Sequence, residues 1–292
     1  MNYTIQHKTA YTYFEPVSCC HNILKLLPRN THQQFCKSSS VKIFPQPDVV
    51  NEYEDFFGNK TIYFSIEKEH GQLTVNITSV IEKQLNIANE IDSPVNSSME
   101  AIKEELQTIN QQSVTVKQYI FETVMTAWNA AIATYTLESF KPMRPVYEAT
   151  KELMNRIYKD FEFKPGFTTI ATPLSVVMRE RKGVCQDFAH LAIACIRSVG
   201  LPARYVSGYI ETLSPEGVEK LVGVDASHAW FSVFIPGMGW VDFDPTNNVL
   251  PTDQHITIGW GRDYADIAPL KGIILSSGLH KLSVSVDVRR EK

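Results

Sequence analysis

Cys185 is the residue of this sequence best placed to act as a nucleophile. It follows the glycine of KGVCQDF and directly precedes a helical pattern whose apolar residues recur along one face (Phe188, Leu191, Ala192, Cys195, Ile196 and Val199). At a helix N-terminus, unpaired backbone N–H groups and the helix dipole favour a thiolate and could hold a developing oxyanion. Cys195 lies on the apolar face, which predicts an inert core thiol. Position alone leaves reactive and structural roles open for Cys185.

A nucleophilic cysteine needs a general base and a group that orients the base. The stretch SHAWFSVFIPGMGWVDFDPTN predicts a β-hairpin in which His228 opens the first strand and Asp244 closes the second. Side chains alternate along a strand, so a four-residue connection would turn these two side chains to opposite faces. An odd-length connection or a bulge would place them diagonally, roughly 7–8 Å apart at the backbone. We therefore predict a three- or five-residue connection, or a bulge.

Asp242 and His190 are the nearest competitors for these roles. Asp242 lies two residues before Asp244 on the same predicted strand, so its side chain would point to the same face of the sheet, further from the strand end. We prefer Asp244, because catalytic side chains tend to reach a cleft where strands end beside loops. His190 lies off the apolar face of its helix, which predicts a solvated or supporting residue. His228 itself has the alternative role of a residue that caps an aromatic strand.

The elements that must position these residues divide the chain in two. From residue 3 to about residue 85, short segments rich in β-branched and aromatic residues alternate with turns, which predicts an antiparallel sandwich or open barrel. A helical pattern follows a change of composition near Pro94. We predict a β-rich N-terminal domain at 1–94, with a role in folding or partner docking. A second domain at 95–292 would hold the helical segment, the catalytic core and the C-terminal strands.

Composition narrows the classes of partner. The chain has 292 residues, a formal net charge of −4 and no long basic run, which argues against nucleic acid as a partner. No apolar stretch approaches the roughly 18 residues that a membrane span requires, so we expect no membrane partner. We expect a cytoplasmic protein, and leave an unusual export route open. The oligomeric state is not predicted.

The five cysteines are odd in number and scattered, which favours free thiols over disulfides. A short span does bring thiols and imidazoles together (Cys19, Cys20, His21, His32 and Cys36). Neighbouring strand residues point to opposite faces and no C-x-x-C pattern is present, so we do not favour zinc there. No EF-hand pattern is present either. We expect the chemistry to need neither metal nor cofactor.

Three blocks in this order carry a family resemblance: GVCQDFAHLAIACIRSVGLPARYVSGY, SHAWFSVFIPGMGWVDFDPTN and GWGRDYADIAP. They resemble the bacterial branch of the transglutaminase-like superfamily, whose members include candidate cysteine proteases. The segments TYFEPV, LKLLPR, EDFFGN and HGQL are similar to the β-rich domain that precedes this core in many bacterial members. The resemblance implies an α+β fold with a papain-like core, in which a cysteine at a helix N-terminus packs on an antiparallel sheet. It implies Cys185 as nucleophile, His228 as base and Asp244 as its orienting group.

The chemistry expected is attack on a peptide or protein amide through a thioester intermediate. Water as acceptor would make the protein a cysteine protease or amidase, and an amine would make it a transglutaminase. We favour hydrolysis, because no sequence feature indicates shielding of a thioester from water. Gln186 is a conceivable second oxyanion donor by analogy with papain-like enzymes. The alternative from another class is a binding module that retains the fold without the activity.

Overall fold

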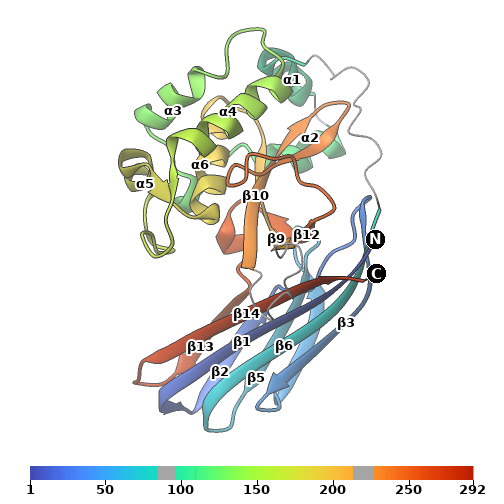
Figure 1. The fold of residues 1–292 in the computed structure, drawn as a ribbon, viewed down its shortest axis with the longest axis vertical. Helices are drawn as coiled ribbons and strands as arrows, with labels where there is room; N and C mark the ends of the chain where they lie inside the picture. The colour runs from blue at the N-terminus through green and yellow to red at the C-terminus, as the bar shows by residue number, and fades with distance from the viewer. Residues whose placement is uncertain (85–96, 109, 213–225, 292) are drawn as a thin grey trace, which may run out of the picture.

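The computed structural model describes residues 1–84, 97–108, 110–212 and 226–291. The fold is α+β, as predicted. Figure 1 shows long strands gathered at one end of the molecule and the helices at the other, with a smaller sheet between them. None of the described helices combines the length and apolar character needed to cross a bilayer.

Two four-stranded antiparallel sheets form the β-rich end. Their strand orders are β14-β1-β6-β3 and β13-β2-β5-β4. Along β6 the apolar side chains of Leu73, Val75 and Ile77 are buried between the sheets, in the alternation that the sequence predicts. The strands are β1 (Asn2–Val17), β2 (Cys19–Leu24), β3 (Gln34–Phe44), β4 (Val49–Glu54), β5 (Lys60–Ile66), β6 (His70–Lys83), β13 (Leu270–Leu275) and β14 (His280–Arg290).

The chain returns to this end after it has built the rest of the molecule. β13 pairs with β2 and β14 pairs with β1, so the last two strands lie in the sheets of the N-terminal region. The second predicted domain, at 95–292, includes these two strands. The predicted boundary at Pro94 lies outside the described residues, and the division at 94 stays a prediction.

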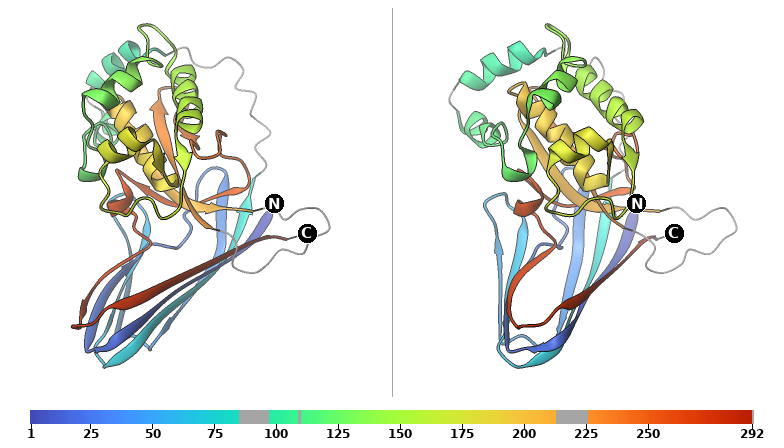
Figure 2. Two further views of the ribbon diagram at one scale, coloured as in Figure 1. Left: turned by 60° about the vertical axis from the view of Figure 1, so that its left-hand side comes forward. Right: turned by 90° about the vertical axis from the view of Figure 1, so that its left-hand side faces the viewer.

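The helical end is built around α6 (Cys185–Ser198), whose residues from 187 to 197 are all buried. The other helices surround it, as the two views of Figure 2 show. They are α1 (Met99–Gln107), α2 (Gln111–Lys117), η1 (Val124–Thr126), α3 (Ala130–Leu137), α4 (Val146–Asp160) and α5 (Leu174–Glu180). A short parallel pair, β7 (Glu162–Phe163) and β8 (Lys182–Gly183), leads the chain into α6. α6 is therefore the central element of the helical layer.

A four-stranded antiparallel sheet of order β11-β10-β9-β12 packs against α6. The predicted hairpin is present, because Ile235 pairs with Gly239 and leaves the connection 236–238. This three-residue connection confirms the predicted odd length. Phe231 and Ala203 face α6, whereas Trp230 and Arg204 lie on the opposite face. The strands are β9 (Ala203–Ile210), β10 (Ala226–Ile235), β11 (Gly239–Phe243) and β12 (His255–Gly261), and η2 (Tyr264–Asp266) follows.

Two side-chain amides dock the β-sandwich onto the edge strand β12. The Gln34 amide donates to the carbonyl of Thr257 at 2.7 Å and accepts from its N–H at 2.9 Å. In the same way, the Asn59 amide donates to the carbonyl of Trp260 at 2.8 Å and accepts from its N–H at 3.0 Å. An edge strand presents unpaired backbone groups, and these amides satisfy them from the neighbouring sheets. The sandwich thus helps to fix β12 in place.

Candidate active site

Cys185 is the first residue of α6, as the sequence predicts. The carboxylate of Asp187 caps the helix, because it accepts from the N–H of Val184 at 2.8 Å and from the Thr168 hydroxyl at 2.6 Å. Gly183 makes room for this cap, since a Cβ there would lie 2.9 Å from the Asp187 carboxylate oxygen. The half-buried Cys185 thiol therefore lies on a fixed helical turn, beside N–H groups that have no partner within the helix.

His228 lies near the start of β10, where its buried ring connects two other groups. Its Nε2 atom is 2.8 Å from Oδ2 of Asp244, and its side chain also hydrogen-bonds Cys185. Because Nε2 faces the carboxylate, Nδ1 is the ring nitrogen left for the thiol. Burial lowers the pKa of His228, but the hydrogen bonds and charges of Asp244 and Cys185 outweigh it and raise the pKa to about 10. The imidazolium form is favoured at neutral pH.

Asp244 is fully buried just beyond β11. The register of the hairpin places it opposite Trp230, and so diagonally across from His228 as predicted. Its Oδ1 atom accepts from the N–H groups of Thr246 and Asn247 at 2.9 and 3.2 Å. Burial raises the pKa of this carboxyl, but hydrogen bonds from His228, His255 and Asn247 hold it well below its usual range. A buried carboxylate with so many donors is a fixed negative charge.

Asp242, the competing carboxylate, serves other partners. It accepts hydrogen bonds from the Trp230 indole, at 3.0 Å, and from the Ser232 hydroxyl. Within the described residues, none of its hydrogen bonds involves His228. The geometry therefore brings His228 together with Asp244 rather than with Asp242.

His190 is buried, so the solvated alternative predicted for it is wrong and the supporting role remains. Its Nε2 atom accepts from the N–H of Tyr264 at 3.1 Å, and its ring packs on Tyr205 with centroids 4.9 Å apart. Burial, reinforced by the charge of Arg197, lowers the pKa of His190 to about 3. The neutral ring accepts a hydrogen bond from η2 and so connects η2 to α6.

Comparisons with known proteins identify the family. The bacterial transglutaminase-like N-terminal region matches residues 3–82, and the transglutaminase-like superfamily matches residues 133–245. Uncharacterised proteins of Mycobacterium tuberculosis and Mycobacterium bovis are 36% identical to this chain over 292 residues, which cover 98% of this chain and 92% of theirs. The chain belongs to the transglutaminase-like superfamily.

A solved structure supports the same transglutaminase-like fold. A protein of Cytophaga hutchinsonii, named as a candidate cysteine protease, superimposes with a TM-score of 0.74 at 21% identity, over 100% of this chain and 92% of that chain. A protein-glutamine gamma-glutamyltransferase of Pseudomonas aeruginosa is 29% identical over 117 residues, which cover 37% of this chain and 18% of that protein. The superfamily match at 133–245 contains Cys185, His228 and Asp244.

Sequence reasoning missed two residues of this transglutaminase-like site, His255 and Asn247. The Nε2 atom of His255 is 3.0 Å from Oδ2 of Asp244, and the Asn247 amide donates to the same oxygen at 2.7 Å. Asn247 directly follows the DPT block, so a turn at Asp244 could have suggested it. The pairing of β12 with β9 brings His255 close to Asp244, and no local sequence pattern predicts this pairing.

His228, Asp244 and His255 are also the one group among the described residues whose ligand atoms converge closely enough to hold a metal ion, all within 4.8 Å of one another. Both imidazole nitrogens lie at hydrogen-bond distance, 2.8 and 3.0 Å, from the same carboxylate oxygen. Ligands of a tetrahedral zinc ion would lie further apart, at about 3.3 Å for bonds of about 2.0 Å. The geometry fits a hydrogen-bond network better than a metal centre.

The cysteines of the N-terminal span do not converge. Cys20 is buried in the sandwich, whereas Cys19 is partly exposed and its sulfur lies 3.5 Å from His21. His21 also bonds the Tyr63 hydroxyl at 2.7 Å. The alternation of side chains along β2 separates the two thiols. All five cysteines are free thiols.

Proposed function

We propose that this protein is a thiol-dependent amide hydrolase that uses Cys185, His228 and Asp244 as a catalytic triad. The observation that supports this proposal is the hydrogen-bonded series from Cys185 through His228 to Asp244, with the thiol at the N-terminus of α6. A nucleophile, its base and a group that orients the base are the three parts that such chemistry requires. The substrate class is a peptide or protein amide.

The resting state of the proposed site is an ion pair. Since the pKa of His228 is raised to about 10, its imidazole holds a proton at neutral pH. The proposed partner in this pair is the Cys185 thiolate. The positive end of the α6 dipole and the imidazolium stabilise this thiolate. Asp244 stabilises the imidazolium through Nε2. The nucleophile is thus charged before the substrate arrives.

In the acylation half of the proposed reaction, the thiolate attacks the amide carbonyl carbon, and the C=O electron pair moves onto oxygen. The Cys185 N–H at the start of α6 stabilises this oxyanion. Gln186, the conceivable second donor, is half-buried and stays a prediction. When the C–N bond breaks, Nδ1 of His228 gives its proton to the departing nitrogen, which leaves a thioester and a neutral imidazole.

In the second half, water attacks the thioester carbonyl and gives a proton to Nδ1 of His228. The C–S bond then breaks, the acid leaves, and the thiolate–imidazolium pair is restored. The buried Asp244 carboxylate keeps the imidazole in one orientation through both proton transfers. Its further donors His255 and Asn247 hold the carboxylate in turn.

Transamidation is the second candidate, and the partial similarity to the gamma-glutamyltransferase of Pseudomonas aeruginosa favours it. The two reactions share acylation and differ only in whether water or an amine accepts the acyl group. A comparison of products with and without an added amine therefore separates them.

The test is incubation with a peptide library, with and without a primary amine such as dansylcadaverine, followed by mass spectrometry. Hydrolysis predicts new peptide termini or glutamate in place of glutamine in both samples. Incorporation of the amine in preference to water would assign transamidation instead. Cys185→Ala should give no product, whereas the matched control Cys195→Ala should give the wild-type products. Products that persist in Cys185→Ala would contradict the proposed nucleophile.

A further inference from the structure

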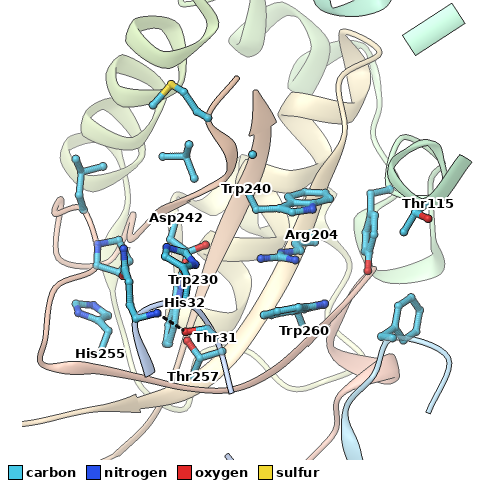
Figure 3. Close-up of a pocket in the computed structure, with 18 of the residues that line it drawn as sticks. Thr31, His32, Thr115, Arg204, Trp230, Trp240, Asp242, His255, Thr257 and Trp260 are labelled. Atoms are coloured by element: carbon cyan, nitrogen blue, oxygen red, sulfur yellow. Dashed lines mark hydrogen bonds between the residues drawn. The ribbon is translucent and has the colours of Figure 1, made fainter. Parts of the chain in front are cut away.

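A cavity of about 900 Å³ lies on the face of the core sheet that is turned away from α6. Its walls come from the β-sandwich, from the α2 region and from the β10–β11 hairpin, as Figure 3 shows. Cys185 and His228 are not among its lining residues, whereas His255 is. The cavity is therefore a separate space that adjoins the proposed triad through His255, whose imidazole bonds Asp244, and through Trp230, whose ring centroid lies 6.0 Å from that of His228.

Arg204 is the feature of this cavity that calls for an explanation. Its guanidinium lies between two indoles, with Cζ 4.4 Å from the ring centroid of Trp240 and 3.7 Å from that of Trp260 (Figure 3). Arg29 also stacks on Trp260, with its Cζ 3.4 Å from the ring centroid. Stacking of this kind covers the faces of the guanidinium and leaves only its edge for hydrogen bonds.

That edge has no hydrogen-bond acceptor among the described residues. Arg204 is only 8% exposed, and its Nε is a buried donor without a partner. Burial lowers the pKa of Arg204 to about 10, so the group is still a cation at neutral pH. A buried cation whose donors are unsatisfied is costly, and native structures seldom retain one without a partner.

The charges around the cavity do not supply that partner. Asp242 is the one carboxylate in the cavity lining, and its oxygens are engaged by Trp230 and Ser232. It acts on Arg204 through space, without a hydrogen bond. Lys83 adds a second buried cation, which donates to the carbonyl of His255 at 2.8 Å. The fixed charges of the lining are thus two cations and one anion, with room for a further negative group.

We propose that this cavity binds a small organic carboxylate, whose carboxyl group pairs with the edge of Arg204 and whose apolar body lies among the tryptophans. A planar guanidinium with both faces covered matches a planar carboxylate that approaches in the same plane. A volume of about 900 Å³ is typical of a pocket for a small molecule. The indoles of Trp230, Trp240 and Trp260 provide the apolar walls.

Benzoate is the probe that tests this proposal, and benzamide is its neutral control of equal shape. Three of the protein's four tryptophans line the cavity, so tryptophan fluorescence should report binding, with calorimetry as a second readout. We expect wild-type protein to bind benzoate at least tenfold more tightly than benzamide. Equal binding of the two, or no benzoate binding at millimolar concentration, would overturn the proposal.

Variants connect the probe to Arg204. Arg204→Met keeps an unbranched side chain without charge and should weaken benzoate binding at least tenfold. Arg204→Lys keeps the charge but loses the planar pair of N–H donors, and should give an intermediate affinity. Arg179→Gln removes an exposed arginine elsewhere and should bind as wild type does. Circular dichroism checks that each variant is folded. If Arg204→Met is unfolded, the benzoate affinity of Arg204→Lys tests the role of Arg204. Wild-type affinity in a folded Arg204 variant would contradict the assignment.

Discussion

Cys185 and Cys195 lie on the same helix and occupy opposite environments. Cys195 is fully buried in the middle of α6, and burial raises the pKa of its thiol to about 12. Cys185 lies half-buried in the first turn, beside N–H groups that have no partner within the helix, and in hydrogen-bond contact with His228. Position along the helix, rather than residue type, therefore separates a core thiol from a candidate nucleophile.

Two buried histidines, His228 on β10 and His190 on α6, show the same contrast. His228 and His190 are both buried, yet the pKa of the first is raised to about 10 and that of the second is lowered to about 3. His228 meets a carboxylate and a thiol, which outweigh its burial. His190 accepts a hydrogen bond from a backbone N–H, and the nearby charge of Arg197 adds to the effect of burial on its pKa. A buried imidazole becomes an acid or a neutral acceptor according to its partners.

The largest expected effect is that of Cys185→Ala, which should abolish amide turnover and leave the free energy of unfolding almost unchanged. The thiol carries little of the core, so its removal costs little packing. Cys195→Ala should do the reverse, with activity kept and stability lowered by about 1 kcal/mol for the lost buried atom. Turnover assays and urea unfolding measure both variants. A large loss of stability in Cys185→Ala would show that the thiol is a core residue.

His228→Ala should be nearly as severe. It removes the base and the acid for the leaving group, a loss of about 10²–10⁴ in kcat/KM. His190→Gln should cost only a few-fold, because glutamine retains an acceptor for the N–H of Tyr264. Comparable losses in the two variants would mean that His228 acts only through the fold.

Asp244→Asn should retain some activity, although the comparable change in a serine protease costs about 10⁴ in kcat. The loss of the carboxylate also lowers the pKa of His228, since hydrogen bonding and charge from Asp244 help to raise it to about 10. The alkaline limb of the kcat/KM profile should therefore move to lower pH. Asp253→Asn, which changes a surface carboxylate paired with Arg290, is the control. An alkaline limb that stays in place would remove Asp244 from the proposed triad.

A smaller effect concerns stability in acid. Because the pKa of His190 is lowered to about 3 from an ordinary 6.5, the unfolded chain binds a proton that the folded chain does not between these values. The free energy of unfolding should fall as pH decreases through this window, by up to about 1.4 kcal/mol per pH unit for one group. His190→Gln should flatten this dependence, measured by urea unfolding at several pH values. The exposed His280→Gln is the control, and an equal flattening there would contradict the explanation.

Strand parity and helix pattern predicted the centre of the site, because both are local properties of the chain. The spacing of apolar residues placed Cys185 at the start of α6, and the hairpin required the odd connection that is found at 236–238. Pairings between distant segments were not predictable in the same way. His255 reaches Asp244 on β12, and the C-terminal strands pair with β1 and β2, through contacts that no local pattern encodes.

The most direct test of the proposed nucleophile needs no substrate. Brief iodoacetamide treatment at pH 6, followed by mass spectrometry of each cysteine, compares the thiolate character of all five thiols. The proposed triad predicts fast labelling of Cys185, slow labelling of Cys195 and the other cysteines, and loss of the fast reaction in His228→Ala. If Cys185 reacted no faster than the other cysteines, the protein would be better described as a binding module with a transglutaminase-like fold.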